Sequence, residues 1–382
     1  KFMRKIVRAS SIFLLCVFIS IDLARADDQL VATSKLPQNF YAFATSSKLA
    51  NPGVLIVDPS SKTDLYDMNG DQAHTPASVF KLVTTFTSLH VLTAQYKFTT
   101  SVFSSEKKET IVIQGSRDPW LTSNISLAKK NGQVYLPGLI MKTDLMKSRK
   151  SKTVPIHIEY TGLFENDIKN LSYYFKKNHR KVIFTNLSPE EAQADSTNLI
   201  GKAESLPIFD MVKFAILWSD NQLADRLVRE AARHENLSTD HFGLQKVVET
   251  SLHAYGISTD KLFIVDGAGL DKENAVTPRT IIEVLMEIRN NPLFQAIYQG
   301  LPVSGESGTL KNRFNKTGSN AIGLVRAKTG WINSVVSLAG FVTVGNKEYI
   351  FAVIADHITP GFKYRNRARE TIDSLLGTIA AP

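Results

Sequence analysis

The sequence has 382 residues, of which 43% are hydrophobic and 21% charged, a composition typical of a folded globular protein. It excludes a disordered chain, a collagen and a coiled coil, and the length allows two domains. The net charge of +9 falls to about +5 without the basic amino terminus, and no basic run carries interleaved aromatics, so we expect no nucleic-acid binding.

Residues 1–26 have the layout of a secretory signal peptide. Basic residues precede the apolar stretch SSIFLLCVFISIDL, and Ala24-Arg25-Ala26 fits a small-x-small cleavage site. The stretch is shorter than the ~20 residues of a membrane span, and Asp22 interrupts it. We therefore expect export, cleavage after Ala26, a periplasmic location and no stable membrane anchor after cleavage. Because Cys16 is the single cysteine, the mature chain is predicted to form no disulfide.

The first half of the mature chain changes character near residue 98. Residues 54–67 predict two strands around the turn PSSKT, and an apolar-periodic helix is expected to begin after Thr75-Pro76-Ala77. From about 97 to 203, short strand-like runs (IVIQG, VPIHIEYTGLF, KVIFTN) alternate with polar linkers. The run KTDLMKSRKSK at 142–152 is read as a solvated loop.

The second half predicts helices and a closing set of strands. A helical pattern over 209–233 breaks at Trp218-Ser219-Asp220-Asn221, and residues 262–266 predict a short strand. Thr277-Pro278 predicts a helix start, residues 323–357 predict consecutive antiparallel strands, and 367–378 a last helix. We therefore predict one discontinuous domain, 27–98 with 204–382, interrupted by a mostly β or mixed inserted domain at 99–203.

Three short motifs occur in one order: Ser78-x-x-Lys81, Ser219-Asp220-Asn221 and Lys328-Thr329-Gly330. This set is characteristic of penicillin-binding proteins and class A β-lactamases. Each motif alone is weak, because S-x-x-K also occurs at four other serines and K-T-G also occurs at Lys316. Context selects the trio: Ser78 is at a helix start and Lys328 is on a strand, whereas Lys316 lies in loop composition.

Residue chemistry explains the first motif. Residues i and i+3 share a helix face, so Lys81 can lie beside Ser78. A serine hydroxyl needs a base to become a nucleophile, and a lysine serves only if its pKa falls by desolvation or a nearby cation such as Lys328. The helix terminus at Ser78 and the strand edge at Trp331 offer N–H groups for an oxyanion. If each motif is considered alone, a helix-capping role is the simpler interpretation of Ser78 and of Ser219.

At these residues the chain resembles the D-Ala-D-Ala carboxypeptidase/endopeptidase family of low-molecular-mass penicillin-binding proteins with an insertion. The resemblance extends to the stretches His74–Thr85, Gly115–Leu121 (like the family's G-D-P-x-L), Asp266–Leu270 and Leu338–Phe341. It implies an α+β fold of the penicilloyl-serine-transferase type: an antiparallel sheet flanked by helices, an all-helical lobe and a smaller β-rich insertion. The gap from Ser78 to Ser219 is shorter than expected, which implies a reduced insertion, and Ala268 replaces a usual serine.

The resemblance also implies residue roles and partners. Ser78 is expected to attack the D-Ala-D-Ala carbonyl, Lys81 to act as base, and Ser219 with Lys328 to relay the proton toward the leaving amine. The remaining contacts to a peptidoglycan stem peptide are expected from Asn221, Thr329, Gly330 and Trp331. β-Lactam antibiotics are expected to acylate Ser78. No metal-ligand cluster is found, so no metal or cofactor is expected.

Three alternatives remain open on the same residues. A class A β-lactamase would carry an E-x-x-L-N segment after Ser219, which is not found. A non-catalytic peptidoglycan-binding homologue would not need the intact Ser78 and Lys81. A small-ester hydrolase on this fold usually has tyrosine at the position of Ser219.

Overall fold

The computed structural model describes residues 36–147 and 154–380, and residues 38–382 form one compact unit. The predicted leader at 1–26 lies outside the described residues, as does part of the 142–152 run. Within the described residues, no helix is both long and apolar enough to cross a membrane.

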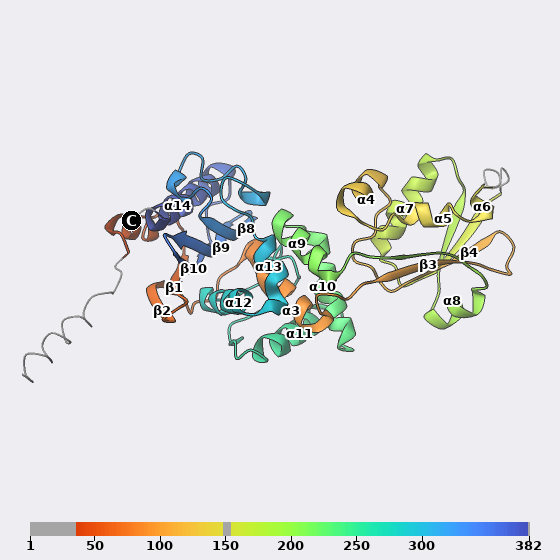
Figure 1. The fold of residues 1–382 in the computed structure, drawn as a ribbon, viewed down its shortest axis with the longest axis horizontal. Helices are drawn as coiled ribbons and strands as arrows, with labels where there is room; N and C mark the ends of the chain where they lie inside the picture. The colour runs from red at the N-terminus through yellow and green to blue at the C-terminus, as the bar shows by residue number, and fades with distance from the viewer. Residues whose placement is uncertain (1–35, 148–153, 381–382) are drawn as a thin grey trace, which may run out of the picture. The chain divides into compact units, whose positions relative to one another are not determined.

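The first sheet joins strands from both ends of the chain, in the order β2-β1-β10-β9-β8 (Figure 1). Neighbouring strands all run antiparallel, and β1 lies against β10 with Leu55 opposite Ala352. The bounds are Pro52–Asp58 (β1), Thr63–Met68 (β2), Val325–Ile332 (β8), Val335–Val344 (β9) and Lys347–Ala355 (β10). Because five consecutive residues of β1 are buried, this strand is covered on both faces.

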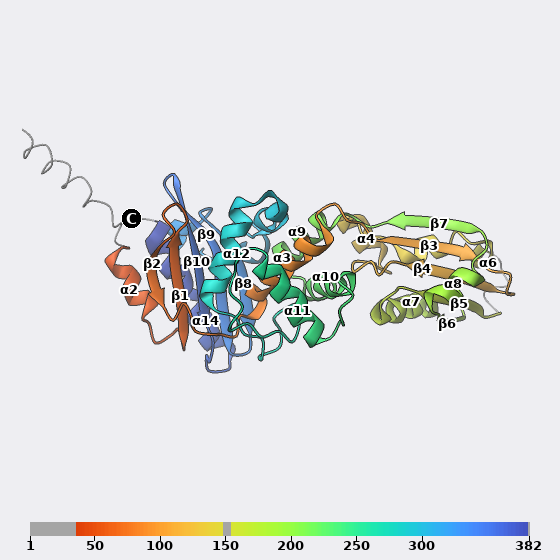
Figure 2. The same cartoon turned by 90° about the horizontal axis from the view of Figure 1, so that it is seen from below.

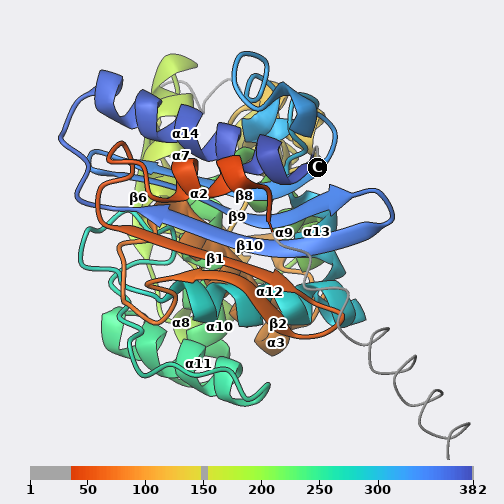
Figure 3. The same ribbon diagram turned by 90° about the vertical axis from the view of Figure 1, so that its left-hand side faces the viewer.

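Helices cover the two faces of this sheet (Figure 3). The closing helix α14 (Phe362–Ala380) packs on β9 and on α2 (Gln38–Ala44), while α12 (Pro278–Asn290) packs on β1 and β10. Helix α12 begins as predicted, with Thr277 as its cap accepting a hydrogen bond from the N–H of Thr280.

An all-helical lobe lies beside α12 and shares its hydrophobic core. Its longer elements are α3 (Lys81–Leu92), α9 (Ile208–Trp218), α10 (Asn221–His234) and α11 (His241–His253). Helix α3 follows the 3₁₀ turn η1 (Ala77–Phe80) and packs against both α10 and α11. Shorter elements complete the region: η3 (Pro292–Phe294), α13 (Gln295–Gly300), η4 (Gly308–Leu310) and η5 (Ser319–Ala321).

The interrupting segment forms a second sheet in the order β6-β5-β4-β3-β7 (Figure 2). Its strands are Thr99–Ser104 (β3), Thr110–Gly115 (β4), Ile156–Thr161 (β5), Val182–Asn186 (β6) and Leu199–Glu204 (β7). The first strand, β3, pairs with the last, β7, so the chain leaves and returns at one place, as an insertion must. Strand β5 runs parallel to both β4 and β6.

Helices alternate with these strands, so the segment is mixed rather than only strand-rich. They are Ile125–Asn131 (α4), Leu136–Ile140 (α5), Asp144–Lys147 (α6), Glu165–Lys177 (α7) and Pro189–Asp195 (α8). Parallel strands need such crossover connections, which explains α7 between β5 and β6. A separate hydrophobic core fills this segment, including Ile111, Ile158 and Phe175.

Two local sequence predictions need correction. Residues 262–266 do not form a strand, because Phe263 makes only an isolated bridge with Ala275. The loop that replaces the strand is held by hydrogen bonds to Asp266 and Asn274. The predicted solvated loop at 142–152 includes a helical turn, α6.

Candidate active site

The nucleophile segment enters the helical lobe through a strained turn. Ala77 has a left-handed φ of +50°, and Ser78 lies in η1, one turn before α3 begins at Lys81. Lys81 Nζ donates to the Oγ of Ser78 at 2.8 Å. Lys81 is fully buried and Ser78 is 7% exposed, so the pair sits at the edge of the core.

Two more acceptors surround the Lys81 ammonium. Its Nζ donates to Asn221 Oδ1 at 2.7 Å and to the carbonyl of Ala268 at 2.8 Å. Burial lowers the pKa of Lys81 to about 8, although Asp266 and two other carboxylates oppose the shift. Since an exposed lysine titrates near pH 10.4, this shift gives roughly a tenth of Lys81 in the basic form at neutral pH.

A second buried lysine comes from β8. Ser219 ends α9 in a left-handed conformation, with φ +57°, which places its side chain between α9 and α10. Lys328 Nζ donates to the Oγ of Ser219 at 2.8 Å and to the Thr329 carbonyl at 2.7 Å. Burial and then the Lys81 charge hold the pKa of Lys328 well below its ordinary value.

The outer edge of β8 presents N–H groups toward η1. Ala327 N–H points away from β9, because it donates to the Pro302 carbonyl. N–H groups alternate in direction along a strand, so those of Thr329 and Trp331 face this same edge. The N–H of Trp331 therefore points away from β9, at the edge of β8 that is not paired with that strand.

Gly330 allows β8 to approach the nucleophile segment closely. A Cβ at this position would lie 2.0 Å from Ser337 Oγ and 2.8 Å from the Pro76 carbonyl. The same Ser337 hydroxyl donates to Pro76 at 2.6 Å, which ties β9 to the turn before Ser78. The glycine of K-T-G is thus explained by packing.

Sequence reasoning missed two participants. The hydroxyl of Thr329 donates to that of Thr309, in η4, at 2.9 Å, which fixes its orientation. The second is the Ala268 carbonyl, held in place because Asp266 accepts from the N–H groups of Ala268, Leu270 and Asp271. The contact to Lys81 uses a main-chain oxygen, so a serine side chain at position 268 is not required for it.

The eight predicted site residues lie in three adjoining regions. Ser78 and Lys81 come from η1 and α3, Ser219 and Asn221 from the α9–α10 junction, and the remaining four from β8. Hydrogen bonds join Ser78, Lys81 and Asn221 in one group and Ser219 with Lys328 in another. Beside them, a shallow cavity of about 540 Å³ is lined by Asn221, Gln222, Asp225, Val265, Asp266, Ala268, Leu270 and Asp271.

This arrangement suits acyl transfer. A hydroxyl lies within hydrogen-bond distance of an amine whose pKa has fallen, and a second amine contacts a hydroxyl that can pass a proton. A family model described as "D-Ala-D-Ala carboxypeptidase 3 (S13) family" matches residues 38–131 and 176–378. The chain belongs to this S13 family. It is a serine peptidase. Among the described residues, the unmatched range 132–175 includes α5, α6, β5 and most of α7.

Two curated relatives of the chain are named as carboxypeptidases. The chain is 25% identical over 392 aligned residues to "Carboxypeptidase DacB" of Mycolicibacterium smegmatis, covering 88% of this chain and 83% of that protein. It is 32% identical over 165 residues to "D-alanyl-D-alanine carboxypeptidase DacB" of Haemophilus influenzae, covering 43% of this chain and 34% of that protein.

A solved structure confirms the predicted fold class. Penicillin binding protein 4 (dacB) of Haemophilus influenzae superposes with a TM-score of 0.66 at 18% identity, covering 89% of this chain and 97% of the other. The resemblance to the S13 family and the α+β transpeptidase-like fold are therefore confirmed. Among the described residues, no group of three or more His, Cys, Asp or Glu side chains is placed to hold a metal ion.

Proposed function

We propose that this S13-family peptidase cleaves the D-Ala-D-Ala bond of peptidoglycan stem peptides through an acyl-enzyme on Ser78, as a carboxypeptidase or cross-link endopeptidase. The observation that carries the proposal is the pair of buried lysines, each within 2.8 Å of a serine hydroxyl. A fold that needed these residues only for stability gains little from burying two ammonium groups beside each other.

Acylation begins with proton transfer from Ser78 Oγ to neutral Lys81 Nζ. The oxygen then attacks the carbonyl of the penultimate D-Ala, and the oxyanion accepts hydrogen bonds from the N–H groups of Ser78 and Trp331. The proton passes from Lys81 through Ser219, which Lys328 orients, to the leaving D-Ala nitrogen. The C–N bond breaks, and the acyl group remains on Ser78.

Substrate is held by the groups around this path. Lys328 and the Thr329 hydroxyl, once it turns from Thr309 to the substrate, hold the terminal carboxylate, and Asn221 hydrogen-bonds the peptide backbone. Water then attacks the acyl-enzyme, with Lys81 again taking a proton, and releases the shortened peptide. β-Lactams acylate the same serine but deacylate slowly, which is consistent with the name of the superposed penicillin binding protein.

An exported enzyme fits this substrate, because peptidoglycan lies outside the cytoplasmic membrane. The basic and apolar leader with its Ala24-Arg25-Ala26 site supports export and a periplasmic location. Amino-terminal sequencing of the protein recovered from the periplasm of an expressing host tests cleavage after Ala26.

The activity is tested by incubating the mature protein with a small peptide ending in D-Ala-D-Ala and with cross-linked wall fragments. Release of free D-Ala supports a carboxypeptidase, and cleavage of the cross-links alone supports an endopeptidase. Ser78→Ala is expected to abolish both the release of D-Ala and the cleavage of cross-links. Fast turnover of penicillin without peptide cleavage would instead favour the β-lactamase alternative.

A further inference from the structure

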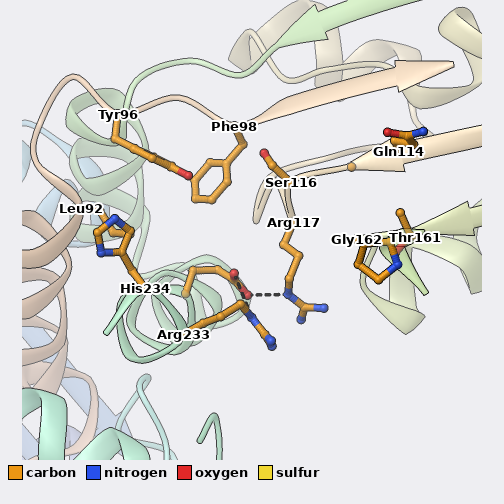
Figure 4. Close-up of a pocket in the computed structure, with 13 residues that line it drawn as sticks. Leu92, Tyr96, Phe98, Gln114, Ser116, Arg117, Thr161, Gly162, Arg233 and His234 are labelled. Atoms are coloured by element: carbon orange, nitrogen blue, oxygen red, sulfur yellow. Dashed lines mark hydrogen bonds and ion pairs between the residues drawn. The ribbon is translucent and has the colours of Figure 1, made fainter. Parts of the chain in front are cut away.

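One motif of the sequence analysis takes no part in the proposed chemistry. The stretch Gly115–Leu121, which resembles the family's G-D-P-x-L, begins at the last residue of β4, and its first three residues form part of the wall of a second cavity (Figure 4). This junction cavity has a volume of about 530 Å³ and lies where the inserted sheet meets the far ends of α3 and α10. Cavities between packed domains are frequent ligand sites. It is lined by Leu92, Tyr96, Phe98, Gln114, Gly115, Ser116, Arg117, Thr161, Gly162, Pro189, Glu230, Arg233 and His234.

Arg117 occupies this wall in a conformation that favours glycine. Its φ is +64°, and it stands where the resembling pattern has the glycine of G-D-P. A side chain in the left-handed region is strained, and such strain concentrates at sites where a side chain must point in one direction. The main chain is fixed there by a hydrogen bond from Arg117 N–H to the Gly162 carbonyl at 2.9 Å.

The Arg117 side chain is directed into the cavity toward α10 (Figure 4). Its Nε donates to Glu230 Oε1 at 2.7 Å, and its guanidinium carbon lies 4.3 Å from the centre of the Phe164 ring. Arg233 approaches the other oxygen of Glu230 at 3.4 Å, and its side chain is 47% exposed. Two guanidinium groups therefore share one carboxylate, which leaves a net positive charge in the cavity.

Donors remain free for a ligand. Among the described residues, the Nη atoms of Arg117 and Arg233 have no hydrogen-bond partner in the protein. The paired N–H groups of arginine match the two oxygens of a carboxylate. Tyr96 and Phe98 form an aromatic wall opposite, and such rings pack against the apolar faces of sugars and peptides (Figure 4).

The junction cavity is separate from the active site. Helix α10 begins at Asn221, which contacts Lys81, and Arg233 is twelve residues later on the same helix. At the rise of an α-helix this separation is about 18 Å. A group bound in the cavity is therefore too far from Ser78 to contain the bond that is cleaved, but it can belong to the same polymer.

We propose that the junction cavity binds a carboxylate-bearing fragment of the cell-wall polymer, as a second contact apart from the cleaved bond. The carboxylate comes either from an acidic residue of the peptide or from the lactyl group of an N-acetylmuramic acid from which the stem peptide has been removed, since in the intact polymer that group is an amide. The choice of ligand rests on the proposed function, whereas the anion site itself rests only on the cavity.

The test measures binding after Ser78 has been blocked with benzylpenicillin. N-acetylmuramic acid, the dipeptide L-Ala-γ-D-Glu and the uncharged N-acetylglucosamine are titrated separately, by calorimetry or by NMR. We expect one acidic probe to bind and N-acetylglucosamine to bind at least tenfold more weakly. The acid that binds identifies the source of the carboxylate.

Two variants and one control make the test specific. Arg117→Gly removes the guanidinium and relieves the left-handed φ, and Arg233→Ala removes an exposed side chain. Each is expected to weaken binding of the acidic probe at least tenfold while thermal unfolding stays cooperative. Arg289→Ala removes a comparable ion pair, with Glu348 at 3.0 Å, that does not line the cavity, and it should leave binding within twofold.

Three results would overturn the inference: neither acid binds, the uncharged sugar binds as tightly, or both arginine variants bind like the unchanged protein. Failure of the proposed function is distinguishable, since it appears as absence of penicillin labelling before any probe is added. The titration of the unlabelled protein then still decides whether the cavity is an anion site.

Discussion

The two ends of helix α10 differ in the burial of the charged side chains that they contact. At its start, Asn221 contacts Lys81 in a site where two lysines are fully buried and burial lowers the pKa of both. Near its end, Glu230 pairs with arginines that are partly exposed. Lysine can lose its proton when it is buried, whereas arginine stays charged. The first end is therefore suited to proton transfer and the second to holding the inserted segment and an anion.

A buried ion pair lies on α10 between its two ends. Arg226 of α10 donates to both carboxylate oxygens of Asp167, at 3.2 and 3.0 Å, and to the Pro119 carbonyl at 3.1 Å. Its guanidinium carbon also lies 4.1 Å from the centre of the Phe164 ring. Desolvation raises the pKa of Asp167 in spite of the arginine. These contacts anchor the inserted segment on the helix that carries Asn221.

The largest effect is expected at the start of α10. Lys81→Met keeps the volume of the buried side chain but removes the base, so the rate of Ser78 acylation should fall about a thousandfold. The rate is measured with a fluorescent penicillin at neutral pH, alongside thermal unfolding to show that the variant folds. A rate within tenfold of the unchanged protein would exclude Lys81 as the base.

Breaking the buried pair tests the contact between α10 and the inserted segment. Asp167→Ala leaves Arg226 buried without its carboxylate and should lower the free energy of unfolding by about 3 kcal/mol. Glu165→Ala, in the same first turn of α7, removes an exposed pair with Lys169 and should change the free energy of unfolding far less. Both values come from urea unfolding. Equal effects of the two variants would contradict the anchoring role of Asp167.

The two K-T-G motifs provide an internal comparison. Lys328→Met should reduce D-Ala release about a hundredfold, because the carboxylate of the substrate loses its contact with the Lys328 amine and Ser219 loses its donor. Lys316→Met alters the exposed copy of the motif and should have no effect on D-Ala release. If Lys316→Met had the larger effect, the assignment of the third motif would be wrong.

The smallest predicted effect is a pH dependence. The lowered pKa of Lys81, about 8, means that the neutral base becomes more abundant as pH rises toward that value. Acylation should therefore accelerate almost tenfold between pH 6 and pH 7 and level off above pH 8, with apparent pKa values that belong to the lysine pair. A rate that falls over the same interval would mean that the reactive form of Lys81 is protonated.

The proximity of Ser78 and Lys81 could be predicted because their spacing is local. Ser78 and Lys81 are three positions apart at a helix start, and the strands from Val325 to Ala355 are joined by short turns. The breaks at Ser219 and Thr277 were also visible as capping residues. These features depend on neighbours in the chain, which a single sequence displays directly.

The parts that escaped prediction depend on the main chain or on distant contacts. The Ala268 carbonyl that accepts from Lys81 is a main-chain group, so no residue type in the sequence marks it. Thr309 contacts the Thr329 hydroxyl only because η4 lies against β8. The run at 262–266 is apolar like a strand, but it forms a loop. The Asn274 side chain accepts a hydrogen bond from the N–H of Asp266, and the Asp266 carboxylate accepts one from the N–H of Ala268. Strand β7, LIGKAE, shows too little apolar alternation to be recognised without its partner β3.

The central claim is that Ser78 forms the acyl-enzyme. It is tested most directly by intact-mass spectrometry and peptide mapping of the protein after brief exposure to benzylpenicillin. We predict one adduct with the full mass of the drug, located on the peptide that contains Ser78 and absent from Ser78→Ala. An adduct on another serine, or an adduct that persists in Ser78→Ala, would contradict the account.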